Sequence, residues 1–153
     1  MIVSAALQQY ADRGVFRGFS VAKATGGRYE YTFTWLMQRP FTLVYDPARR
    51  VLSFRELFPD VGARSAIATA LREVVAERSK RRVPAHKRLD GRRVQARCAV
   101  QRNRFSLTVA VRGATANDSY AVRQMLNLVN ELFLVLHEKY PEYLISHFGL
   151  SSE

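Results

Sequence analysis

Cysteine is nearly absent from this chain of 153 residues, in which Cys98 is the single example. One thiol excludes an intrachain disulfide framework and a zinc site built from cysteines. It is also typical of proteins from a reducing compartment. The length, together with a hydrophobic content of 48%, predicts a single folded domain over residues 1–153.

Long apolar runs are lacking as well. No uncharged apolar stretch reaches the about 18 residues that a membrane-spanning helix needs. The first ten residues, MIVSAALQQY, carry no basic side chain, and their apolar run is too short for a secretory signal. These absences predict a cytoplasmic protein with no membrane partner.

Acidic residues are few, since 13 Asp and Glu stand against 24 Lys and Arg for a net charge of +11. The excess is concentrated in one place. The segment Arg78–Arg104 holds eleven basic residues and one acid, Asp90, so it carries almost the whole net charge. Such a concentration of one sign indicates a partner of the opposite sign.

Patterns of apolar residues predict an α+β fold that begins with a helix near residues 2–12. Four runs of period-two alternation follow, and the clearest is Tyr29, Tyr31, Phe33 and Trp35. Short turns join the runs, so we expect an antiparallel meander. We interpret the aromatic stripe as core rather than as a platform for stacking bases, because a small sheet needs one apolar face.

The second half of the chain predicts a helix from near residue 62 to near residue 80, whose last turn holds Arg78 and Lys80, and then an exposed loop. The basic loop covers about residues 78–93. A two-strand hairpin, with its turn at Arg102 and Asn103, comes next. A long helix up to Pro141 and a short helix over 142–148 complete a single domain with helices on one face of an antiparallel sheet.

The long helix carries an apolar stripe that covers most of its circumference, including Leu126, Leu134 and Val135. A stripe of this width indicates burial on more than one side, either by the rest of the chain or by a second copy. We therefore expect a homodimer.

The order helix, four strands, helix, two strands, helix resembles the type III secretion chaperone-like α/β fold. The residues that carry the resemblance are 29–36, 105–111 and 120–136. It implies a dimeric, non-catalytic protein that binds other polypeptides. Members of that group tend to be acidic, and this chain differs from them in its basic charge.

No arrangement of residues indicates catalysis, a metal or a cofactor. The three histidines, His86, His137 and His147, do not stand at the spacing of metal ligands. Ser20 falls inside a predicted strand, whereas a serine nucleophile of the elbow type needs a strand-to-helix turn. Cys98 shares a strand face with apolar neighbours, which predicts a buried, inert thiol.

We therefore expect a protein that is not an enzyme. An enzyme of unrecognised type stays an open alternative, because linear spacing does not show whether carboxylates such as Glu73, Glu77 and Glu138 converge on a pocket.

The candidate partner-binding residues are the basic side chains of the loop: Arg78, Lys80, Arg81, Arg82, Lys87, Arg88, Arg92 and Arg93. Three interpretations stay open: they bind nucleic acid, they bind an acidic protein, or they pair with carboxylates of their own chain. With the resemblance, these residues predict an interaction module that binds another polypeptide, chaperone-like or adaptor-like. Nucleic-acid binding through Arg78–Arg104 is the alternative.

Overall fold

The computed structural model of the chain describes residues 1–80, 83–84 and 88–149. Two single turns of 3-10 helix, Thr25–Gly27 and Leu36–Gln38, join the first three strands. The elements follow one another in the predicted order: α1 (Ile2–Asp12), β1 (Arg17–Lys23), β2 (Tyr29–Thr34), β3 (Pro40–Asp46), β4 (Val51–Phe58), α2 (Ala66–Glu77), β5 (Val94–Gln101), β6 (Arg104–Val111), α3 (Asn117–Lys139) and α4 (Pro141–Phe148).

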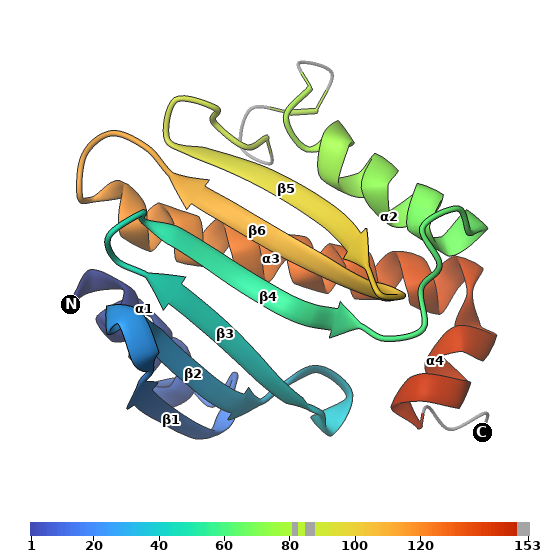
Figure 1. Cartoon of the computed structure of the whole chain (residues 1–153), viewed down its shortest axis with the longest axis horizontal. Helices are drawn as coiled ribbons and strands as arrows, with labels where there is room; N and C mark the ends of the chain where they lie inside the picture. The colour runs from blue at the N-terminus through green and yellow to red at the C-terminus, as the bar shows by residue number, and fades with distance from the viewer. Residues whose placement is uncertain (81–82, 85–87, 150–153) are drawn as a thin grey trace.

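Six strands form one antiparallel sheet in the order β1-β2-β3-β4-β6-β5 (Figure 1). The first four strands are neighbours in sequence and in space, which confirms the predicted meander. β5 and β6 form the predicted hairpin, in which the turn residues Arg102 and Asn103 have positive φ angles of 53° and 59°. This is the type I′ geometry, whose twist matches that of the flanking strands.

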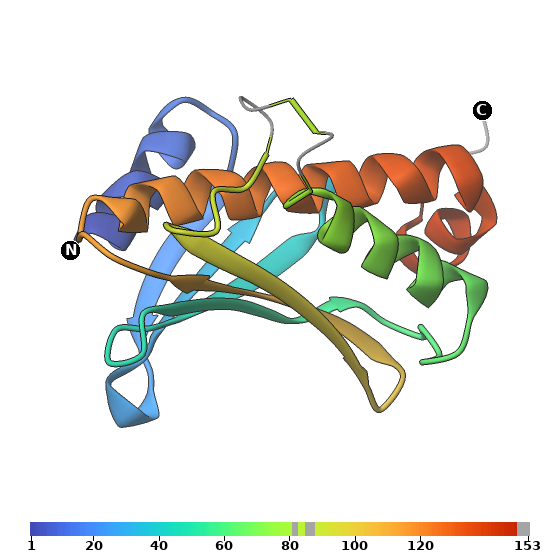
Figure 2. The same cartoon turned by 90° about the horizontal axis from the view of Figure 1, so that it is seen from above.

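Helices α1, α2 and α3 lie on one face of the sheet and leave the other face uncovered (Figure 2). α3 runs along the sheet and contacts α1 and α2 on its flanks. The predicted α+β domain with helices on one face is confirmed. The core of this layer includes buried side chains of α3: Met125, Leu128, Val129, Leu132 and Leu136.

The alternating aromatic residues of β2 face the helix layer. Tyr31 and Phe33 are buried, whereas Thr32 between them is exposed. The core interpretation of the aromatic stripe is confirmed. The ring of Phe33 contacts the rings of Phe16, Phe41 and Phe54, among others.

α2 is shorter than its apolar spacing predicts. It begins at Ala66 rather than near residue 62 and ends at Glu77 rather than near residue 80. The hydroxyl of Ser65 accepts a hydrogen bond from the N–H of Ala68, so Ser65 is the N-cap that sets the start. The basic segment consequently begins after the helix, at the C-cap residue Arg78, and not in its last turn.

The loop that follows α2 is anchored to the core, which its sequence does not reveal. Residues 81–82 and 85–87 of the predicted exposed loop lie outside the described residues. Pro84 is exposed as expected, but Leu89 is buried and its N–H donates to the carbonyl oxygen of Arg78. A single apolar residue is enough to dock a loop, and it leaves no periodic pattern to detect.

α3 is buried on more than one side, as predicted, and the sheet, α1 and α2 supply that cover. Val122 and Leu126, which widen the stripe, are buried within the chain. Leu134 is different, because its side chain is 58% exposed. The breadth of the stripe therefore reflects burial within one chain along most of its length.

A buried ion pair ties the turn between β3 and β4 to the start of α3. Arg50 donates from Nη2 and Nε to Asp118 Oδ1, at 2.8 and 3.2 Å. The same guanidinium donates to the carbonyl oxygens of Gly113 and Ala114. Asp118, 7% exposed, is the one buried charged residue among those described.

Candidate functional site

The candidate site lies on the uncovered face of the sheet, called here the open face. In β2 and β6, and in parts of β3 and β4, the residues that alternate with the buried ones point to this face. Several of these residues are small and polar: Thr32, Thr42, Ser53, Ser106 and Thr108. Their hydroxyl groups can both donate and accept hydrogen bonds.

β3 and β4 diverge along the open face (Figure 1). Their ladder starts at the connecting turn and ends with the pair Val44 and Ser53. In the same register Thr42 would stand opposite Arg55, but this pair does not form. Beyond Val44, β3 stays paired with β2 while β4 follows β6. The facing edges of β3 and β4 therefore lack ladder partners in this stretch.

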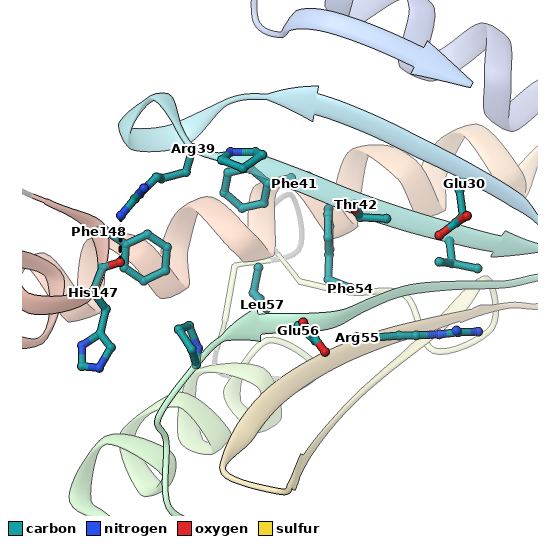
Figure 3. Close-up of a pocket in the computed structure, with 13 residues that line it drawn as sticks. Glu30, Arg39, Phe41, Thr42, Phe54, Arg55, Glu56, Leu57, His147 and Phe148 are labelled. Carbon is teal, nitrogen blue, oxygen red and sulfur yellow. Dashed lines mark hydrogen bonds between the residues drawn. The ribbon is translucent and has the colours of Figure 1, made fainter. Parts of the chain in front are cut away.

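An irregularity in β4 accompanies the divergence. β4 pairs with β6 at Phe54 and again at Phe58, but the register shifts in between, so three residues of β4 stand opposite one of β6. Such a bulge bends the strand and interrupts the alternation of buried and exposed residues. As a result the consecutive residues Arg55 and Glu56 are both exposed and both line the open face (Figure 3).

A groove of about 560 Å³ occupies the space where the two strands separate, and we call it the β3–β4 groove (Figure 3). Its floor is apolar and is formed by Phe41, Phe54 and Leu57. Its rim carries charges of both signs, from Glu30 and Arg55 among others. The groove thus combines an apolar base with polar walls, which is the usual composition of a ligand-binding site.

α4 bounds one end of the groove. Arg39 Nη2 donates to the carbonyl oxygen of His147 at 3.0 Å, and the guanidinium lies 5.9 Å from the centre of the Phe148 ring (Figure 3). Phe148 in turn contacts Phe133 of α3, with ring centres 5.4 Å apart. This end of the groove is therefore held in place by the core.

Tyr143 fastens α4 to the loop after β4. Its hydroxyl donates to the carbonyl oxygen of Pro59. Burial, with a smaller contribution from the carboxylate of Asp60, raises the pKa of the Tyr143 phenol well above its ordinary value. The hydroxyl therefore keeps its proton and remains a donor. His147 adds a second link, because its Nε2 lies 3.1 Å from Asp60 Oδ2.

Five of the eight basic residues predicted to bind a partner lie in the described part of the chain: Arg78, Lys80, Arg88, Arg92 and Arg93. The other three lie outside the described residues: Arg81, Arg82 and Lys87.

The segment between α2 and β5, to which the described basic residues belong, lies beside the helix layer and away from the open face (Figure 2). Arg78 pairs with Glu131 of α3, and Lys80 Nζ lies 3.6 Å from a carboxylate oxygen of Glu77. Arg93 donates to the side-chain oxygen of Asn117 at 2.7 Å and stacks on a tyrosine ring of α3. Arg78, Lys80 and Arg93 each thus have a partner within their own chain.

The basic segment is divided between two faces of the molecule. Its last members belong to the β5–β6 hairpin, and two of them, Arg102 and Arg104, line a depression on the open face. The sequence alone does not distinguish these arginines from those beside α3. In the structure, Arg78 and Arg93 lie on the helix side of the sheet, and Arg102 and Arg104 lie on its open face.

The serine and the cysteine considered for chemistry have structural surroundings. Ser20 lies in β1, as predicted, and its hydroxyl is hydrogen-bonded to that of Thr32 on β2. Cys98 is half-buried, and burial raises the pKa of its thiol, an effect that the nearby charge of Arg72 opposes. A raised pKa disfavours the reactive thiolate.

Two further features are missing from the described residues. They contain no cluster of three or more His, Cys, Asp or Glu side chains with the geometry to hold a metal ion. None of their helices combines the length and the apolar character needed to cross a bilayer.

Sequence reasoning missed the groove residues, above all Thr42 and Arg55. One signal was present: Arg55 and Glu56 are two consecutive charges in a strand that otherwise contains none. In a strand such a pair forces one charge toward the core unless a bulge turns it outward. A break in alternation inside a clear strand is therefore a sign of a bulge.

Comparison of the chain with family models, with curated proteins and with solved structures finds no match. The resemblance to the type III secretion chaperone-like fold accordingly stays a prediction.

Proposed function

We propose that the protein is a non-enzymatic, cytoplasmic interaction module that binds an extended segment of another polypeptide in the β3–β4 groove. The observation that carries the proposal is the early end of the ladder between β3 and β4, after Val44 and Ser53. An extended peptide is the ligand that supplies main-chain partners to unpaired strand edges.

The apolar floor of the groove supports the same ligand. Side chains of an extended peptide alternate between two sides, so every second one would point to the floor formed by Phe41, Phe54 and Leu57. The remaining side chains would meet the polar rim or solvent. Main-chain pairing would thus provide affinity, and the floor would select apolar residues at alternate positions.

Nucleic-acid binding through Arg78–Arg104 is the alternative, and two observations favour the polypeptide. Sheets that bind single-stranded nucleic acid present aromatic rings to the bases, whereas Tyr31 and Phe33 of this sheet face the helix layer. In addition, Arg78 and Arg93 already have partners in their own chain, which reduces their availability for phosphates.

Filling the groove is expected to abolish peptide binding. Thr42 is exposed and lines the groove, so Thr42→Trp places an indole where the peptide would lie. With a short fluorescent peptide in which valine alternates with glutamine, we expect Thr42→Trp to weaken binding about tenfold or more in an anisotropy titration. Hydrogen exchange of residues 40–46 and 51–58 should slow when the peptide binds to the wild type.

Ala22→Trp is the matched control, because Ala22 is exposed on the same face but belongs to the edge strand β1. It should bind the peptide as the wild type does. Equal affinity of the wild type and Thr42→Trp would contradict the proposal. Salt-dependent binding of a labelled oligonucleotide, with no binding of the peptide, would favour the alternative instead.

We also propose that two copies of the chain associate through an apolar depression beside α3, which is separate from the groove. The depression measures about 260 Å³ and is lined by Leu36, Met37 and Leu134 among others. Of the described residues that line it, none is Asp, Glu, Lys or Arg. In a chain with a net charge of +11, two copies meet least repulsion at such an uncharged surface.

Leu134→Glu is expected to weaken this self-association by roughly thirtyfold or more, because it buries a carboxylate at the contact. Sedimentation equilibrium of the wild type and the variant measures the change. Asn127→Glu adds the same charge at an exposed position of α3 outside the depression, and it should associate as the wild type does. A monomeric wild type would contradict the dimer.

A further inference from the structure

A second depression lies on the open face beside the β3–β4 groove, at the end of the β5–β6 hairpin. It measures about 470 Å³, and its walls come from β4 and from the hairpin. We call it the arginine pocket. The lining residues that matter for its chemistry are Ser53, Arg55, Glu56, Arg102, Arg104 and Thr108.

The arginine pocket has an excess of positive charge. The pocket contains three guanidinium groups, those of Arg55, Arg102 and Arg104. The ion pair of Arg104 with Glu56 neutralises one of them. Neither Arg55 nor Arg102 forms an ion pair with any of the described residues. Both side chains are exposed, so two guanidinium groups remain available to a ligand.

Hydroxyl groups complete the pocket. Ser53 of β4 and Thr108 of β6 are directly opposite each other in the sheet, so their side chains lie next to one another on the open face. Neither hydroxyl is hydrogen-bonded to another of the described residues. Two hydroxyl donors in the same pocket as guanidinium groups are suited to an anionic oxygen.

The fold places these groups together through the bulge and the tight turn. The bulge in β4 turns Arg55 to the open face at the point where β3 leaves. The type I′ turn places Arg102 at the near end of the hairpin. Arg55 and Glu56 line both the groove and the arginine pocket, so the two depressions are neighbours.

We propose that the arginine pocket binds acidic side chains of the polypeptide that occupies the β3–β4 groove, and the inference rests on that proposed function. A carboxylate accepts two parallel hydrogen bonds from one guanidinium, a geometry that arginine offers and lysine does not. A peptide in the groove passes Arg55, where an acidic residue would reach the pocket. The preferred partner is therefore an acidic segment with apolar residues at alternate positions.

The test compares two short fluorescent peptides, one alternating valine with glutamate and one alternating valine with glutamine. Anisotropy titrations at physiological salt should show that the wild type binds the glutamate peptide about tenfold more tightly, because of charge-assisted hydrogen bonds. Arg102→Glu should remove this preference and leave the affinity for the glutamine peptide unchanged, since Arg102 does not line the groove. Arg55→Glu should remove the preference as well.

Arg64→Glu is the matched control, because it makes the same change of charge at an exposed residue that lines neither depression. It should keep the preference, which separates a local site from attraction by net charge. Equal binding of both peptides to the wild type would overturn the acidic subsite and leave the groove intact. Binding of neither peptide would overturn the proposed function and the subsite together. An oligonucleotide that binds in place of both peptides, and is lost in Arg102→Glu, would assign the pocket to phosphates and overturn the inference.

Discussion

Replacing Arg50 with alanine is expected to lower the free energy of unfolding by about 3 kcal/mol, because it leaves the carboxylate of Asp118 buried without its partner. The Asp118 side chain is 10% exposed and that of Arg50 is 27% exposed, so water replaces the guanidinium only in part. The carbonyl oxygens of Gly113 and Ala114 also lose a donor. Urea unfolding followed by circular dichroism measures the loss.

The neighbouring residue Arg49 provides the control. Its side chain is 79% exposed and lies 4.0 Å from Asp46, so Arg49→Ala should change the stability by less than about 0.5 kcal/mol. A double variant, Arg50→Met with Asp118→Leu, should recover much of the loss because no buried charge remains. Equal small losses in Arg49→Ala and Arg50→Ala would show that the pair is not buried as described.

Phe133→Ala is expected to lower the free energy of unfolding by about 4 kcal/mol, which is the cost of a large cavity in a packed core. Phe133 joins elements that are distant in sequence. Its ring centre lies 5.0 Å from that of Phe58, 5.4 Å from Phe148 and 6.0 Å from Phe41. Removing the ring therefore weakens the contacts of α3 with β3, β4 and α4 at once. Thermal and urea unfolding measure the total effect.

Leu134→Ala, measured at a protein concentration too low for self-association, is the matched control, since the adjacent side chain is 58% exposed. It should cost less than about 0.5 kcal/mol. In Phe133→Ala, hydrogen exchange of α4 should accelerate more than that of β6, because Phe148 loses a ring that holds α4 to the core. A loss as small as that of Leu134→Ala would mean that the rings do not pack against one another.

The unpaired edges of β3 and β4 differ from the outer edges of the sheet in how well they are protected against pairing with another chain. The outer edges of the sheet belong to β1 and β5, which carry charged residues such as Lys23 and Arg97 that discourage pairing with other chains. The facing edges of β3 and β4 lie inside the sheet, where this protection is weaker. An interior gap is therefore the place where a single extended segment, held at one end by α4, can add to the sheet.

Much of the fold was predictable because it follows from local patterns. The alternation of Tyr29, Tyr31 and Phe33 with polar residues defines β2 and identifies its buried face, because side chains of a strand alternate by geometry. The turn at Arg102 and Asn103 follows from its position between two alternating runs. The start of α2 was misplaced because apolar spacing does not show which polar residue is the N-cap, a role taken by Ser65.

The site was predictable only in part. The concentration of arginines in Arg78–Arg104 was visible, but it combines residues that the structure places beside α3 with residues of the open face. Arg55 stands far from this segment in sequence and lies beside Arg102 and Arg104 only because β4 is the neighbour of β6. No local pattern predicts which strands become neighbours when a helix intervenes between them.

The sequence by itself determined the order and type of the helices and strands, the apolar face of the alternating strands, and where the net charge lies, since these depend on neighbours along the chain. The tertiary structure alone decided that β3 and β4 separate after Val44, that a bulge turns Arg55 outward, and that the basic segment is divided between two faces. The physical reason is that β4 pairs with β3 only over Val51–Ser53 and with β6 up to Phe58, and the second pairing joins residues that are distant in sequence. Only the assembled sheet decides that β4 keeps its ladder with β6 and loses its ladder with β3 after Ser53. The groove lies where the ladder with β3 ends.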